Sequence, residues 1–148
     1  MIKADQIEDY FAICEVKARY CRFLDTKEWD SWGDLFTDDI ELDTRPSGGT
    51  LTHGRDEMLR VVRGAIGDAK TAHQVHSPEM QINGDSAQVV WAMQDRVLWP
   101  ADKAAQMGNA GLTGYGHYHE RYVRQGGRWR IAAQILTRLH MDVHPLAG

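Results

Sequence analysis

Hydrophobic residues at the start of the chain recur at the spacing of one helix face. The steps of four, three, four and three are typical of an α-helix, and the positions are Ile7, Phe11, Cys14, Ala18 and Cys21. We therefore predict a long amphipathic helix over residues 5–24. The next step of four falls on Asp25, so a carboxylate would continue the apolar face and point where a core is expected.

After this helix, the pattern predicts four short elements and then a β-rich half. A helix, a strand, a return strand and a third helix are expected at residues 28–36, 37–45, 51–53 and 54–67. Alternation with a period of two then predicts strands at 72–82, 86–99, 112–124 and 128–141. "NGD" and "QGG" form the hairpin turns between them, and residues 100–111 have the composition of a mobile loop or lid.

Helices followed by a run of antiparallel strands indicate the α+β class. A curved antiparallel sheet wrapped around the long N-terminal helix would form a cone with one open mouth. The 148 residues are expected to form one domain, residues 1–148.

Composition narrows the class of protein further. The net charge of −4 and the lack of a basic run argue against a nucleic-acid partner. We find no apolar stretch long enough for a membrane span and no signal-peptide pattern. Cys14 and Cys21 would lie roughly 10 Å apart along one helix, too far for a disulfide. Reduced cysteines predict a cytoplasmic protein.

Asp25 has two interpretations at this point. Buried charge is costly unless it is paired, so a partner in a functional site is one reading. The other is structural: Glu28 follows three residues later, as in a capping box, so Asp25 would be the N-cap of the second helix.

Several phrases, in this order along almost the whole chain, resemble the SnoaL-like branch of the nuclear transport factor 2-like superfamily. They are "YCRFLDTKEWDSWGDLFTDDIELD", "GRDEML", "AHQVHSPEMQINGDSAQVVWAMQD" and "GGRWRIAAQ". The resemblance implies the cone-shaped roll. Its activities are diverse, and include dehydratases, a dehydrochlorinase, isomerases, polyketide cyclases and proteins without catalysis.

In the elimination enzymes of this group, the resemblance implies a His–Asp pair inside the cone, here His73 and Asp25. For the bile acid dehydratases among them, it also implies a tyrosine five residues before the Asp, here Tyr20, and an arginine on the last strand, for which Arg138 is the best candidate. Neutral His73 would take a proton from carbon, and Asp25 would fix its tautomer and stabilise the imidazolium. Tyr20 would donate a hydrogen bond to a developing oxyanion, and Arg138 would hold a carbonyl or anionic group. No cofactor is required for this chemistry.

A second set of polar and apolar residues is expected to bind substrate. Trp91, Met93 and Asp95 alternate along one strand, so Asp95 would line the cavity or pair with an arginine on a neighbouring strand. His117 would be a further pocket residue if its strand face points inward. His117 and His119 have a spacing that can bind a metal with a third ligand, but we expect no metal site, because no companion motif is present.

These observations favour a cofactor-free lyase of the dehydratase type, acting on a hydrophobic, aromatic or polycyclic small molecule. An isomerase or cyclase that uses the same base is the first alternative. A non-catalytic ligand-binding domain is the second, and the small subunit of a ring-hydroxylating dioxygenase is the third. A homodimer or higher homo-oligomer is expected through the outer sheet face.

Overall fold

The computed structural model describes all 148 residues. Three helices precede most of the sheet: α1 (Ile7–Thr26), α2 (Trp29–Gly33) and α3 (Arg55–Ile66), with 3-10 turns at Ala4–Gln6 and Arg45–Ser47. The strands are β1 (Phe36–Asp43), β2 (Leu51–His53), β3 (Lys70–Val75), β4 (Glu79–Asn83), β5 (Ser86–Leu98), β6 (Gly111–Gln125) and β7 (Arg128–His144). A fourth helix, α4 (Ala101–Met107), connects β5 to β6.

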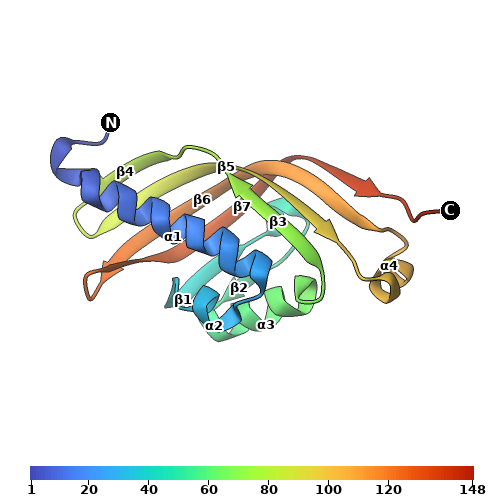
Figure 1. Ribbon diagram of the computed structural model, residues 1–148. Coiled ribbons are helices and arrows are strands. Elements are labelled where there is room, and N and C mark those ends of the chain that lie inside the picture. The colour runs from blue at the N-terminus through green and yellow to red at the C-terminus, as the bar shows by residue number, and fades with distance from the viewer.

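One seven-stranded sheet carries the fold, in the order β2-β1-β7-β6-β5-β3, with β4 also pairing with β5. Figure 1 shows the long strands β5, β6 and β7 arching past α1, with α2 and α3 beside the C-terminal end of α1. The predicted α+β class is confirmed. The sheet is mixed, because β1 runs parallel to β7 while all other pairs are antiparallel.

The buried face of α1 differs from the predicted one. Ile13, Lys17, Tyr20 and Leu24 are buried, again at helical spacing, whereas Ile7 and Phe11 are 49% and 64% exposed. The apolar pattern failed because this helix has hydrophobic residues on both sides. The core also accepts a lysine, which a search for apolar positions scores as surface.

Three predicted elements are corrected by the structure. Residues 100–111 contain α4, which "ADKAAQM" favours through its alanines and which Gly108 ends at φ +71°. The strand expected at 72–82 is divided into β3 and β4, and the break contains Pro78, which has no N–H for a sheet hydrogen bond. The helix expected at 28–36 is only α2, because β1 already begins at Phe36.

Apolar side chains from α1, α2 and the concave strands make a continuous core that includes Trp32, Phe36, Tyr122 and Ile131. No helix combines the length and the apolar character needed to cross a membrane. The C-terminal end of β7 exposes Leu139, Met141 and Val143. The expected homo-oligomer stays a prediction.

Candidate active site

Asp25 and His73 form a hydrogen-bonded pair between the last turn of α1 and strand β3. The Asp25 Oδ1 atom lies 2.7 Å from His73 Nδ1, and Asp25 Oδ2 accepts the backbone N–H of His73 at 2.8 Å. Because an ionised carboxylate only accepts, Nδ1 carries the proton and the lone pair resides on Nε2. Nε2 forms no hydrogen bond within the protein, and the side chain of His73 is 7% exposed.

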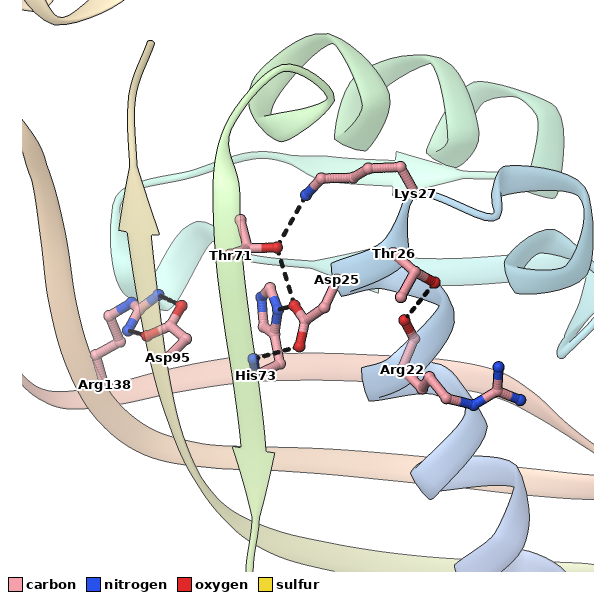
Figure 2. Close-up of polar contacts among 8 residues, drawn as sticks. All are labelled: Arg22, Asp25, Thr26, Lys27, Thr71, His73, Asp95 and Arg138. Atoms are coloured by element: carbon pink, nitrogen blue, oxygen red, sulfur yellow. Dashed lines mark hydrogen bonds and ion pairs between the residues drawn. The ribbon is translucent and has the colours of Figure 1, made fainter.

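Two residues that we did not predict hold this carboxylate in place. Thr71 Oγ1 donates to Asp25 Oδ1 at 2.9 Å, and Lys27 Nζ donates to Thr71 Oγ1 at 2.8 Å (Figure 2). Thr71 lies two residues before His73, so the period of a strand places both side chains on the same face. That alternation was the available signal for Thr71.

Asp25 is not the N-cap of α2. The N-cap is Glu28, which makes no side-chain cap hydrogen bond, and the oxygens of Asp25 are directed to β3 instead. Lys27 ends α1 in the left-handed conformation, at φ +62°. This turn separates Asp25 from α2, so the structural reading of Asp25 is wrong.

The bonds to His73 determine the charge of Asp25. Burial alone raises the pKa of the carboxyl, but the hydrogen bonds from the ring and backbone of His73, its charge and the Thr71 hydroxyl together lower the pKa below its usual value. Asp25 is therefore ionised at neutral pH, as a group that stabilises an imidazolium must be.

The ring of His73 lines a cavity of about 260 Å³ enclosed by α1, α3 and the concave strands. Most of its wall is apolar, and its polar residues include Tyr20, His73, Asp95, Tyr118, Gln134 and Arg138. A larger surface groove of about 620 Å³ lies around Met1, Tyr10 and Met80. None of the residues of that groove forms a hydrogen bond or an ion pair with His73 or Asp25.

Arg138 and Asp95 form a two-pronged ion pair on the cavity wall. The guanidinium Nη1 and Nη2 atoms donate to the two carboxylate oxygens of Asp95 at 2.8 and 2.7 Å (Figure 2). This hydrogen bonding, more than any other effect, raises the pKa of Arg138 above its usual value. The strand between them, β6, contributes Gly114, where an added Cβ would lie 2.2 Å from Arg138 Nη1. The absence of a side chain at Gly114 thus leaves room for the pair.

Tyr20 also lines the cavity, but its hydroxyl is already engaged, donating to Gln134 Oε1 at 3.2 Å. Beneath it is a set of side chains that we call the buried cluster: Lys17, Glu120, Tyr122 and Gln134. Lys17 Nζ lies 2.6 Å from Glu120 Oε1, with both side chains fully buried. Burial lowers the pKa of Lys17, against the opposing effect of Glu120.

Three predicted substrate-binding residues lie elsewhere. Trp91 and Met93 are buried, but they pack in the core and do not line the cavity. His117 faces the outer side of β6 with His119, at a ring separation of 6.2 Å, because inward positions on this strand are occupied by Tyr118 and Glu120. No group of three or more residues there or elsewhere has the geometry of a metal site.

Residues around α4 border the cavity at one edge. Lys103 of α4 donates to the carbonyl of Ala65 in α3 at 2.5 Å and lies 4.8 Å from the ring centroid of Trp99. Ala65 and Trp99 both line the cavity. The segment that was expected to be a loop is thus a helix tied to α3 beside the cavity.

The arrangement combines an oriented imidazole with a free ring nitrogen, an anchored guanidinium and an apolar enclosure. These are the parts needed to remove a proton from carbon and to stabilise the oxyanion that forms.

The chain is similar to known proteins along most of its length. Residues 5–134 match the model of the SnoaL-like domain. "Probable cyclase FGR4" of Gibberella zeae is 28% identical over 134 residues, which are 84% of this chain and 87% of that protein.

Two solved structures have the same fold. The protein described as "Putative Scytalone Dehydratase" from Novosphingobium aromaticivorans superimposes with a TM-score of 0.81 at 18% identity, covering 97% of this chain and 96% of that one. The hexachlorocyclohexane dehydrochlorinase LinA type 2 gives 0.80 at 15% identity, covering 97% and 93%. At these identities the two structures support the fold alone.

Proposed function

The chain belongs to the SnoaL-like domain family, and we propose that it is a lyase that needs no cofactor and eliminates water or another leaving group from a hydrophobic small molecule. His73 would be the base, Asp25 its partner, and Arg138 the group that binds the substrate oxygen. The cavity of about 260 Å³ is below the usual 300–1,000 Å³ of ligand sites. This favours a substrate of one or two rings over a larger polycyclic one.

The observation that carries the proposal is the His73–Asp25 pair at the cavity wall. Nδ1 is bound to a carboxylate at 2.7 Å, and Nε2 has no protein partner. A structural histidine in a core has both nitrogens satisfied, since a buried polar atom without a partner is costly. A free Nε2 beside an apolar cavity is instead what a general base requires.

The proposed reaction uses only this chain's side chains. His73 Nε2 takes the proton from the carbon next to a carbonyl, and the released electron pair forms an enolate whose oxygen Arg138 stabilises. The electron pair then forms the C=C bond as the C–O bond to the leaving group breaks. The imidazolium returns its proton to the departing hydroxide, giving water and restoring neutral His73.

An isomerase or cyclase would use the same first step, and the relative described as a probable cyclase favours keeping this second candidate. The enolate would then be reprotonated at another carbon or attack a second carbonyl, with no leaving group. Mass spectrometry separates these outcomes, because an isomerisation keeps the mass and a dehydration loses water.

The experiment is a screen of small neutral β-hydroxy ketones, followed by variants of His73. We expect His73→Ala to lower turnover by about 10²–10⁴-fold with little change in thermal stability. His76→Ala is the matched control, because His76 is exposed just beyond the end of β3. Equal turnover by His73→Ala and the wild type would contradict the proposal and leave a ligand-binding domain.

A further inference from the structure

Two tyrosines, Tyr20 and Tyr118, line the cavity side by side, and their hydroxyl groups differ in their hydrogen bonds. Tyr20 comes from α1 and Tyr118 from β6, and their ring centroids are 5.9 Å apart. Lys17 Nζ lies over both rings, 3.7 Å from the centroid of Tyr20 and 3.9 Å from that of Tyr118. Both rings are almost fully buried, so only the hydroxyls distinguish them chemically.

The buried cluster determines the direction of the Tyr20 hydrogen bond. Glu120 accepts hydrogen bonds from Lys17 Nζ and from Tyr122 at 2.6 Å each, and also from the amide nitrogen of Gln134. Since a carboxylate beside a lysine only accepts, the NH₂ group of Gln134 must face Glu120. The carbonyl oxygen of Gln134 then faces Tyr20 and takes its proton. Tyr20 therefore has no proton to donate to a ligand.

The Tyr118 hydroxyl is held less tightly. It takes part in none of the short side-chain hydrogen bonds of the cavity, and its proton is directed only toward the Tyr20 oxygen, an interaction that counters the effect of burial on the pKa of Tyr20. The residue is 3% exposed and lines the cavity, so a ligand oxygen can accept this proton instead. The Tyr118 hydroxyl neighbours the Tyr20 hydroxyl and the Asp95 carboxylate closely enough for each to influence its pKa, which burial raises well above the usual value. Tyr118 therefore keeps its proton at neutral pH.

Tyr118 and Arg138 can reach one ligand atom from adjacent strands. In the antiparallel register, Gly116 of β6 is opposite Arg138 of β7, and Tyr118 is opposite Leu136. Tyr118 and Arg138 are thus diagonal neighbours on the concave face. Arg138 directs two of its donors to Asp95, and its remaining N–H groups are available.

We propose that Tyr118, and not Tyr20, is the uncharged donor that binds the substrate oxygen together with Arg138. The assignment rests on the proposed function, because it names the site where the enolate oxygen would form. Tyr20 is then a positioning residue, whose ring forms the wall and whose hydroxyl is held by the buried cluster. The ligand class that follows is a neutral ketone, because Asp95 already balances the charge of Arg138 and Asp25 would repel an anion.

The test compares two bicyclic probes that differ in one oxygen, 1-tetralone and tetralin. A ketone oxygen can only accept, so it does not bind the Nε2 lone pair of His73 or the lone pair of Tyr20. We expect the wild type to bind 1-tetralone about tenfold more tightly than tetralin, the value of one hydrogen bond to a buried donor. Tyr118→Phe should lose most of this preference and keep only the part that Arg138 contributes, and the matched variant Tyr20→Phe should keep the preference within about threefold of wild type. Calorimetry measures both affinities.

Three results would overturn the inference: no preference in the wild type, an undiminished preference in Tyr118→Phe, or an equal loss in Tyr20→Phe. If Tyr118→Phe fails to fold, the amide spectrum of wild-type protein with 1-tetralone replaces it. Without a shift of the Tyr118 signals, the inference is again wrong.

A second readout separates this inference from the proposed function. Exchange of the protons next to the carbonyl of 1-tetralone for deuterium, followed by NMR in D₂O, reports the base. His73→Ala should stop this exchange and keep the preference for 1-tetralone. Loss of the preference in Tyr118→Phe with no exchange in the wild type would uphold the oxygen site and reject the proposed base.

Discussion

Two ion-paired clusters lie about two turns apart on α1, and they differ in what they leave unsatisfied. Lys17 and Glu120 are both fully shielded from solvent, and the oxygens of Glu120 are filled by Lys17, Tyr122 and Gln134. Asp25 is 23% exposed and His73 7%. In this pair one atom, His73 Nε2, has no partner.

The difference shows that the most deeply buried charged group of α1 is not the one that can act on a ligand. Burial alone would mark Lys17 as the exceptional residue of the helix, because an unpaired buried charge is the more costly one. Its cluster is closed, so it can bind nothing further. The pair with the uncommitted nitrogen beside a cavity is the one that can act on a ligand.

Of the variants that test this comparison, Lys17→Met is expected to have the largest effect on stability. Removing one partner of a buried ion pair leaves Glu120 charged and unpaired, so we expect a loss of about 3–5 kcal/mol in the free energy of unfolding. Urea denaturation measures it. The double variant Lys17→Met/Glu120→Gln should recover part of the loss. Full stability of Lys17→Met combined with loss of activity would instead show that the buried cluster takes part in the activity.

Gly114→Ala tests the Arg138–Asp95 ion pair, which is intermediate between the two clusters. Both oxygens of Asp95 are bonded, but Arg138 has further N–H groups for a ligand. The new Cβ would lie 2.2 Å from Arg138 Nη1 and 3.3 Å from Asp95 Oδ1, so the guanidinium must move. We expect turnover to fall by up to about 10²-fold, the effect of misplacing a catalytic group by roughly 1 Å. Gly64→Ala is the control, because its Cβ would meet nothing within 4 Å. Unchanged kinetics in Gly114→Ala would show that the position of Arg138 is not critical.

The smallest effect is the pH dependence of Asp25→Asn. Because the folded protein lowers the pKa of Asp25 below its ordinary value, the ionised carboxylate stabilises the fold. This stabilisation is complete above about pH 5 and is lost as the pH falls through the lowered pKa. We expect wild type to exceed Asp25→Asn by about 1–2 kcal/mol at neutral pH, with the gap closing below pH 4. Thermal melts from pH 3 to 7 measure it, and a gap independent of pH would mean that the charge contributes nothing.

The order of elements and the fold class could be predicted from the sequence because turn signals and periodicity are local. "NGD" and "QGG" mark hairpins by the residues themselves. The phase of α1 could not be predicted in the same way. Its buried face depends on Lys17 finding Glu120, 103 residues away, and no local pattern shows that contact.

The candidate site was predicted in part. Asp25, His73, Tyr20 and Arg138 were named through the family resemblance, and the structure brings all but Asp25 to the cavity wall, with Asp25 bound behind His73. Asp95 was expected to line the cavity or to pair with an arginine, and it does both. His117 was expected in the pocket but lies on the outer face of β6. Which face of a strand points inward depends on the neighbouring strands, and the local sequence does not show it. Tyr118 was missed because a tyrosine among aromatics looks like a core residue until its hydroxyl is located.

Asp25 holds the main chain and the ring of the same residue, one carboxylate oxygen on each. The amide proton of His73 is therefore protected only while the carboxylate is in place. Its exchange with solvent deuterium counts the molecules in which α1 has come away from β3. In those molecules the imidazole has also lost its orientation. A single backbone amide thus reports the fraction of protein with an assembled base, in the absence of substrate.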